Sequence, residues 1–175
     1  AEVEPHVAGV AAIHVHSTGI IDYPGVCQAL AGELESSGRA HIRTGARVLR
    51  IEGQSSPVLL LASGEALECT HAINCAGLHS DRVATASGAR PDTRIVPFRG
   101  EYFTRAPEAE HLVRHLIYPV PDPRFPFLGV HFTRMAAGGI ECGPNAVFAL
   151  AREGYRWRNI SPRDLASSLT WPGTW

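Results

Sequence analysis

The sequence predicts a mixed fold of the α+β or α/β class, in which a partial nucleotide-binding layer is interleaved with a separate β-sheet. A helix is expected near the start of the nucleotide-binding layer, because Val26, Leu30 and Leu34 recur every four residues along one helical face. The strand-like run 46–51 follows and completes one helix–strand unit. Beyond residue 91 most segments have strand character, which separates a β-rich half from that unit.

Composition and charge are typical of a soluble protein with a packed core. The 175 residues suit one ordinary domain or the remains of two smaller ones. Hydrophobic residues make up 45% and charged residues 19%. A formal net charge of -1 provides no concentrated basic field, so we expect binding to neither nucleic acid nor a membrane surface.

The cysteines predict no metal site. Cys27, Cys69, Cys75 and Cys142 are scattered, without a CxxC pair or a nearby pair of histidines. We expect reduced thiols in the core of an intracellular protein.

Apolar spacing and turn residues justify the elements of the first half. Pro24 costs little in the first helical turn, where its missing N–H has no partner, and Gly38 ends the helix. A Ser63-Gly64 turn joins two apolar runs into a hairpin. We expect, in order, a strand over 10–15, an extended run over 20–23, the helix from Tyr23, a strand over 46–51, hairpin strands over 58–61 and 66–69, a short buried strand over 71–77, and a helix with Ser80 as N-cap.

The second half is expected to be mostly strand. The loop 118–127 cannot be a central strand, because its prolines remove ladder donors. Ser161, followed by Pro162 and Asp164, is typical of a helix N-terminus. We expect strands over 95–104, 129–133 and 140–142, with a further edge at 147–150.

A series of short motifs carries a resemblance to a known family. They are Ser17–Tyr23, Ile73–Leu78, Pro97–Phe103, His115–Pro123, Phe127–Met135, Glu141–Val147 and Arg152–Tyr155. In this order and spacing, from about Glu4 to Arg158, they resemble the L-2-hydroxyglutarate oxidase/dehydrogenase family, which are flavoproteins related to D-amino-acid oxidase.

The resemblance implies an FAD enzyme with a Rossmann-like flavin domain and a substrate domain on a mixed sheet. Residues 1–23 and 92–160 would form the substrate domain, 24–91 a partial FAD-binding domain, and 161–175 a truncated C-terminal tail. The family's GxGxxG segment, where pyrophosphate meets a helix N-terminus, has no counterpart in the sequence. We therefore expect a truncated chain, and its ability to bind FAD alone stays open.

The resemblance also places small residues beside FAD. Cys75, Ala76 and Gly77 would let the backbone approach the phosphates, although a simple strand-to-loop turn explains the same residues. Val48 would present its backbone to the adenine, and an ordinary core valine is the alternative.

Arg99 and His131 are the first candidates for substrate chemistry. A guanidinium fork would hold one carboxylate of a 2-hydroxydicarboxylate, whereas an ion pair with Glu101 is the alternative reading of Arg99. Arg134 and Arg152 are other candidate clamps. His131 would accept the hydroxyl proton, and a hydrogen-bonded core histidine is its alternative.

Two tyrosines extend the candidate set. The hydroxyls of Tyr102 and Tyr118 would donate to a substrate carboxylate or flank the flavin, and aromatic core packing is the default alternative for each. Tyr102 joins His131 and Arg99 as a catalytic candidate.

The resemblance implies oxidation of L-2-hydroxyglutarate, or a similar 2-hydroxy acid, to the 2-oxo acid by hydride transfer to FAD. An amine or amino-acid oxidase on the same scaffold is one alternative, and a catalytically silent truncated chain is another. We expect a cytoplasmic location. The electron acceptor, peripheral contact with the inner membrane through that acceptor, and a homo-oligomer formed through an exposed sheet edge all stay open.

Overall fold

The computed structural model describes residues 2–53, 55–124 and 129–174, and the chain divides into two compact units. The first unit comprises Ala1–His41 and Arg99–Val147, and the second comprises Ile42–Phe98 and Phe148–Trp175. Helices and two small antiparallel sheets confirm the mixed α and β class. The division into substrate and flavin domains stays a prediction. Within the described ranges, no helix is long and apolar enough to cross a membrane.

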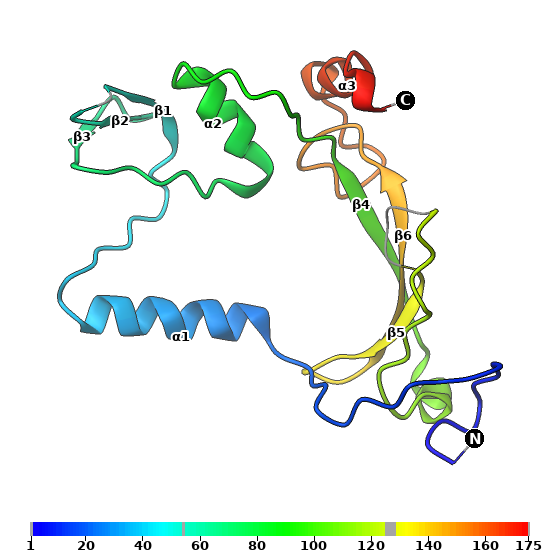
Figure 1. Ribbon diagram of the computed structural model, residues 1–175. Helices are drawn as coiled ribbons and strands as arrows, with labels where there is room; N and C mark the ends of the chain where they lie inside the picture. The colour runs from blue at the N-terminus through cyan, green and yellow to red at the C-terminus, as the bar shows by residue number, and fades with distance from the viewer. Residues whose placement is uncertain (1, 54, 125–128, 175) are drawn as a thin grey trace. The chain divides into compact units, whose positions relative to one another are not determined.

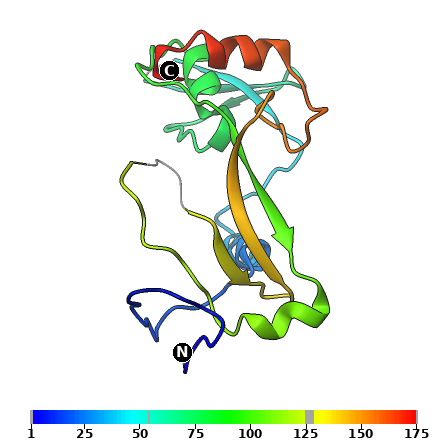
Figure 2. The ribbon, with the colours of Figure 1, turned by 90° about the vertical axis from the view of Figure 1, so that its right-hand side faces the viewer.

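A three-stranded sheet, in the order β4-β6-β5, carries the predicted catalytic residues. The backbone N–H of Arg105 donates to the Ile140 carbonyl, and that of Ala149 to the Pro97 carbonyl. These bonds pair opposite ends of β4 and β6, so the two strands are antiparallel; Figure 2 shows them side by side. The strands are β4 (Phe98–Thr104), β5 (His131–Arg134) and β6 (Ile140–Phe148), with a 3-10 helix over Pro107–Leu112.

The turn between β5 and β6 fixes their register. Gly138 and Gly139 have φ values of +93° and +89°, which side-chain-bearing residues rarely adopt. Ile140 is fully buried at the start of β6 and anchors the hairpin. The strands predicted near 129–133 and 140–142 are confirmed, and the edge expected at 147–150 is the end of β6 itself.

Helix α1 (Tyr23–Ser36) confirms the predicted helix. Pro24 lies in its first turn, and the Ser37 backbone N–H donates to the Glu33 carbonyl at 3.1 Å where the helix ends. The apolar stripe is not covered, however, because Leu30 and Leu34 are 54% and 52% exposed. The helix forms from local signals without burying this face in the described chain.

The second unit is built on the sheet β1-β2-β3 with α2 and α3 (Figure 1). The Ile51 backbone N–H donates to the Ser87 hydroxyl at 2.8 Å, which ties β1 to the end of α2. The predicted hairpin is confirmed as β2 and β3, joined at Gly64. The elements are β1 (Val48–Glu52), β2 (Val58–Leu61), β3 (Ala66–Glu68), α2 (Ser80–Ala86) and α3 (Pro162–Leu169), with 3-10 turns over Gly77–His79 and Pro172–Thr174.

The two predicted helix starts in this unit have different outcomes. Ser161 caps α3 as expected, because its hydroxyl accepts the Asp164 backbone N–H at 3.3 Å. Ser80 is not the N-cap of α2: it is the first helical residue, and His79 precedes it. A 3-10 turn runs directly into this helix, which shifts the cap by one position.

Two predicted strands are wrong. Residues 10–15 and 71–77 form no strand among the described residues, and Ile13 and Ile73 lie 90% and 86% exposed. A strand needs neighbouring backbone for its hydrogen bonds, and apolar patterning alone cannot supply it. The expected strand 95–104 begins at Phe98. Residues 125–128, which fall in the predicted proline-rich loop and in the motif 127–135, lie outside the described residues.

Candidate functional site

His131 opens β5 and is held on two sides within the first unit. The residue is only 8% exposed, and its Nδ1 atom lies 3.0 Å from the Gly129 carbonyl oxygen. Its ring stacks on Tyr118, with centroids 4.4 Å apart and planes 18° apart. The imidazole is therefore both buried and fixed in orientation, as a catalytic or a structural histidine requires.

Tyr102 and His131 share one face of the sheet. Gly143 on β6 pairs directly with His131, and directly opposed residues point to the same face. A Cβ built on Gly143 would lie 2.7 Å from Cδ1 of Tyr102, so the tyrosine ring covers this glycine. The structure thus brings two of the three catalytic candidates onto one cross-strand row, with a residue between them that has no side chain.

Arg99 lies on the other face. It is three residues from Tyr102 along β4, and side chains alternate along a strand. Its Nε and Nη2 donate to Glu101 Oε1 at 2.9 and 2.7 Å, and its side chain is 6% exposed. This geometry favours the ion-pair reading over a substrate clamp, because the guanidinium already has a carboxylate.

Three of the four predicted cofactor residues line a cavity of about 810 Å³ in the second unit. Val48, Cys75 and Ala76 all line it. Gly77 follows directly, with φ of +52° and open space where a Cβ would stand. A volume of this size suits a small-molecule ligand.

The loop that carries these small residues is held by one asparagine. Asn74 Oδ1 accepts the Ala76 backbone N–H at 3.1 Å, and Asn74 Nδ2 donates to the Ser80 carbonyl at 2.8 Å. The loop is therefore shaped by local hydrogen bonds rather than by strand pairing, and it presents little side-chain bulk to the cavity.

The walls of this cavity are part apolar and part cationic. Val48, Leu59 and Val83 supply apolar surface, and Arg163 supplies positive charge, whereas the charge of Arg82 is paired with Asp164. Such a lining fits a ligand that combines an aromatic base with phosphate groups. Its residues are therefore compatible with a portion of FAD.

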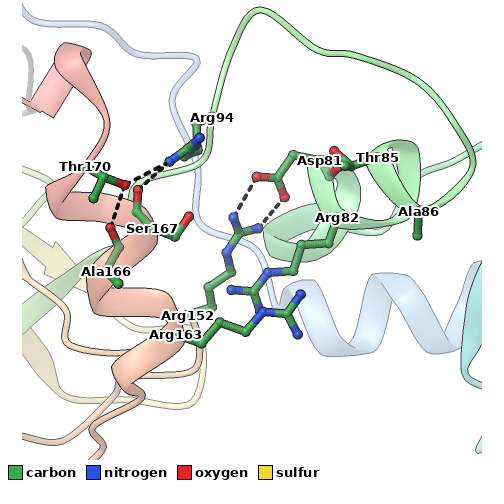
Figure 3. A pocket seen from close by; sticks show the side chains of 10 residues that line it. All are labelled: Asp81, Arg82, Thr85, Ala86, Arg94, Arg152, Arg163, Ala166, Ser167 and Thr170. Carbon is green, nitrogen blue, oxygen red and sulfur yellow. Dashed lines mark hydrogen bonds and ion pairs between the residues drawn. The ribbon is translucent and has the colours of Figure 1, made fainter.

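A second cavity in this unit, of about 520 Å³, adjoins two partly buried ion pairs. Figure 3 shows Arg152 joined to Asp81 by two contacts; the Nη2–Oδ2 distance is 2.6 Å. Arg82 pairs with Asp164, which also accepts the Arg152 backbone N–H at 2.9 Å. The Arg82–Asp164 pair ties α2 to α3, and the Arg152–Asp81 pair ties α2 to the segment that leads into α3.

Both carboxylates are stabilised in their charged form. Hydrogen bonds from Arg152 hold the pKa of Asp81 below its ordinary value. Burial raises the pKa of Asp164, but hydrogen bonds from Arg82 and from the Arg152 backbone outweigh it and leave the pKa lowered. Arg152 is thereby committed to a structural pair and is a weak candidate for a substrate clamp. Arg134 donates to the Val113 carbonyl at 2.6 Å and is similarly engaged.

Sequence reasoning missed Gly143, Arg82 and Arg163. The role of Gly143 can be recognised only once its strand partner His131 is known. The two arginines reach the cavity from α2 and α3, which are far apart in the chain. The described residues contain no group of three or more His, Cys, Asp or Glu side chains arranged to hold a metal ion.

Comparisons with known proteins give consistent matches. The family described as "FAD dependent oxidoreductase" matches residues 1–171. An L-2-hydroxyglutarate dehydrogenase of Indibacter alkaliphilus is 48% identical over 171 residues, which cover 97% of this chain and 43% of that protein. A mitochondrial L-2-hydroxyglutarate dehydrogenase of Caenorhabditis elegans is 48% identical, with 98% and 41% covered. That of Escherichia coli is 45% identical, with 96% and 40% covered. The chain thus spans about two fifths of the length of these relatives.

Proposed function

The chain belongs to the FAD-dependent oxidoreductase family, and we propose that it takes part in oxidising L-2-hydroxyglutarate, or a similar 2-hydroxy acid, to the 2-oxo acid. One observation carries the proposal: relatives named L-2-hydroxyglutarate dehydrogenase match nearly the whole chain at 43–48% identity.

The cavity of the second unit is the proposed place for part of the FAD. Val48, Cys75 and Ala76 line it, and Gly77 leaves its backbone accessible. Arg163 would offset phosphate charge. FAD, when bound, supplies the acceptor for the two electrons removed from the alcohol.

His131 is the proposed acceptor of the substrate hydroxyl proton. Its Nδ1 faces the Gly129 carbonyl, which leaves Nε2 for the substrate. Tyr102, on the same face of the sheet, would donate its hydroxyl to a substrate carboxylate.

Arg99 is proposed to support this site from the opposite face rather than to clamp the substrate. It holds Glu101, the residue next to Tyr102, and so steadies the strand that carries the tyrosine. The direct clamp expected from the sequence would require the Arg99–Glu101 pair to open.

A substrate panel tests the proposed function. Because the chain spans about two fifths of its relatives' length, the 175 residues are measured both alone and in a chimera where they replace the matched segment of the Indibacter alkaliphilus protein. Each is loaded with FAD and mixed without oxygen with L-2-hydroxyglutarate, other 2-hydroxy acids, amino acids or amines. We expect the 2-hydroxy acids to bleach the flavin absorbance of the chimera.

The other outcomes separate the alternatives. Bleaching by amino acids or amines alone would identify an oxidase of that class. A chimera that takes up FAD and responds to no substrate would support a catalytically silent chain, provided that the unmodified relative is active under the same conditions.

The proposal extends to the cellular compartment and the electron acceptor. The animal relatives are named mitochondrial, while the bacterial names carry no compartment. We propose a cytoplasmic protein. An acceptor at the inner membrane would bring it there peripherally, and fractionation of cells that express the tagged protein would test this location.

A further inference from the structure

We infer that the Gly129 carbonyl and the ring of Tyr118 act as positioning groups that hold His131 in one tautomer, with Nδ1 protonated and Nε2 ready to accept a proton. The inference rests on the proposed function for its chemical purpose. The tautomer itself is a property of this chain and can be measured without flavin or substrate.

The tautomer follows from the partner of Nδ1. A carbonyl oxygen only accepts hydrogen bonds, so at 3.0 Å from the Gly129 oxygen the Nδ1 atom must carry the hydrogen. A neutral imidazole has one donor and one acceptor nitrogen. Nε2 is therefore the acceptor whenever His131 is neutral, which is the state that a proton acceptor needs.

Tyr118 restrains the ring from its flat side. The stacked geometry, with 4.4 Å between centroids and 18° between planes, limits rotation of the imidazole about its Cβ–Cγ bond. A rotation of that bond by half a turn would move Nδ1 away from the Gly129 carbonyl, put Cδ2 in its place, and put Cε1 where Nε2 stood. The stack with Tyr118 therefore restrains both the position of the His131 ring and its tautomer.

The backbone places Tyr118 where it can do this. Ile117 and Phe132 form a bridge with two hydrogen bonds, in which the Ile117 N–H donates at 3.0 Å and the Phe132 N–H donates at 2.9 Å. The neighbours of these residues, Tyr118 and His131, are consequently opposed across the bridge. The stack is a consequence of strand-like pairing rather than of a flexible side-chain encounter.

The Nε2 atom of His131 makes no hydrogen bond within the described part of the chain. The one hydrogen bond that the ring makes there is through Nδ1. Nε2 is not among the described side-chain atoms that are buried without a partner, so it keeps some contact with solvent. An open Nε2 is what a base needs in order to reach its substrate.

Nitrogen NMR of the imidazole tests the tautomer directly in this 175-residue chain. With ¹⁵N-labelled histidine at a pH where His131 is neutral, we expect Nδ1 to show the shift of a protonated nitrogen and Nε2 that of an unprotonated one. In Tyr118→Ala the two shifts should move toward each other as the tautomers exchange. A protonated Nε2 in the unmodified chain, or an unchanged pattern in Tyr118→Ala, would overturn the inference.

Flavin-reduction kinetics test its consequence in the FAD-loaded chimera. Tyr118→Ala should slow the reduction step about tenfold, with little change in the substrate concentration needed for half-saturation. Tyr118→Phe, which keeps the ring, should recover most of that loss. Tyr155→Ala removes an exposed tyrosine from the second unit and serves as the matched control.

A double variant separates positioning from general stability. If Tyr118 acts through His131, Tyr118→Ala should slow the reaction no further in a His131→Ala background. Additive losses would contradict the inference. A chimera whose flavin no 2-hydroxy acid bleaches would refute the proposed function instead, and the NMR result would still decide the tautomer.

Discussion

At the scale of single residues, His131 carries the proposed chemistry. Replacing it with Ala should slow flavin reduction by about 100-fold, since a positioned base contributes that order of acceleration. FAD binding should change far less, because His131→Ala alters none of the proposed cofactor residues. Rapid-mixing absorbance gives the rate and FAD fluorescence gives the affinity. A rate equal to that of the unmodified chimera would remove His131 from the mechanism.

Asp81 is the carboxylate partner of the buried Arg152 in the second unit. Arg152 meets it with two hydrogen bonds and is 4% exposed. Asp81→Asn should lower the free energy of unfolding by about 3 kcal/mol, because a charge would remain buried without its partner. Urea unfolding of the 175-residue chain measures this. Asp122→Asn, in an exposed pair with Arg124, is the control and should barely move the midpoint.

The same pair predicts how stability depends on pH. The pKa of Asp81 is lowered in the folded chain by Arg152, so the folded state binds protons less readily there than the unfolded state. Its stabilisation is complete above the ordinary carboxyl pKa of about 4 and is lost as pH falls through the lower folded value. The stability gap between the unmodified chain and Asp81→Asn should shrink in that acidic window, and a gap that widens there would contradict the assignment.

At the scale of elements, substituting two glycines by Ala is predicted to change stability in opposite directions. A Cβ on Gly143 would lie 2.7 Å from the Tyr102 ring and 2.8 Å from the Glu101 carbonyl oxygen, so Gly143→Ala should cost about 1–3 kcal/mol and displace Tyr102. Gly32 lies inside α1, and a Cβ added there would meet nothing within 4 Å, so Gly32→Ala should add about 0.5–1 kcal/mol. Thermal unfolding of both variants checks the signs.

Elements with local signals were predictable from the sequence, and those that need a partner were not. The helix Tyr23–Ser36 and the hairpin around Gly64 arise from periodicity and turn residues, which the sequence contains in full. Residues 71–77 are as apolar as a buried strand, but strand formation depends on neighbouring backbone that no pattern specifies.

In the candidate site, too, features that depend on local spacing were predictable from the sequence, and those that depend on distant contacts were not. The competition between Glu101 and a substrate for Arg99 was visible in the sequence, because residues two apart on a strand share a face. The convergence of Arg82 and Arg163 on one cavity was not, since it depends on how two distant helices pack in the second unit. The Tyr118–His131 stack likewise depends on a bridge between residues far apart in the chain.

At the scale of the whole molecule, exposed apolar surface is the main feature. Ile13, Ile73 and the α1 stripe of Leu30 and Leu34 are at least half exposed. An uncovered apolar helix face such as that of Leu30 and Leu34 promotes association. We expect the 175-residue chain to self-associate, with a molar mass by light scattering that rises with concentration. Leu30→Gln with Leu34→Gln should reduce this, and a monomer at all concentrations would contradict the expectation that this helix face drives self-association.

The central claim is that a 2-hydroxy acid gives up its C2 hydrogen and its hydroxyl proton at a site that includes His131. The most direct test is anaerobic flavin bleaching in the FAD-loaded chimera, with L-2-hydroxyglutarate that carries either hydrogen or deuterium at C2. We predict bleaching by the L isomer, slower bleaching with deuterium, and a much lower rate in His131→Ala. Flavin that takes up no electrons from L-2-hydroxyglutarate, while the unmodified Indibacter alkaliphilus relative is bleached, would contradict the claim.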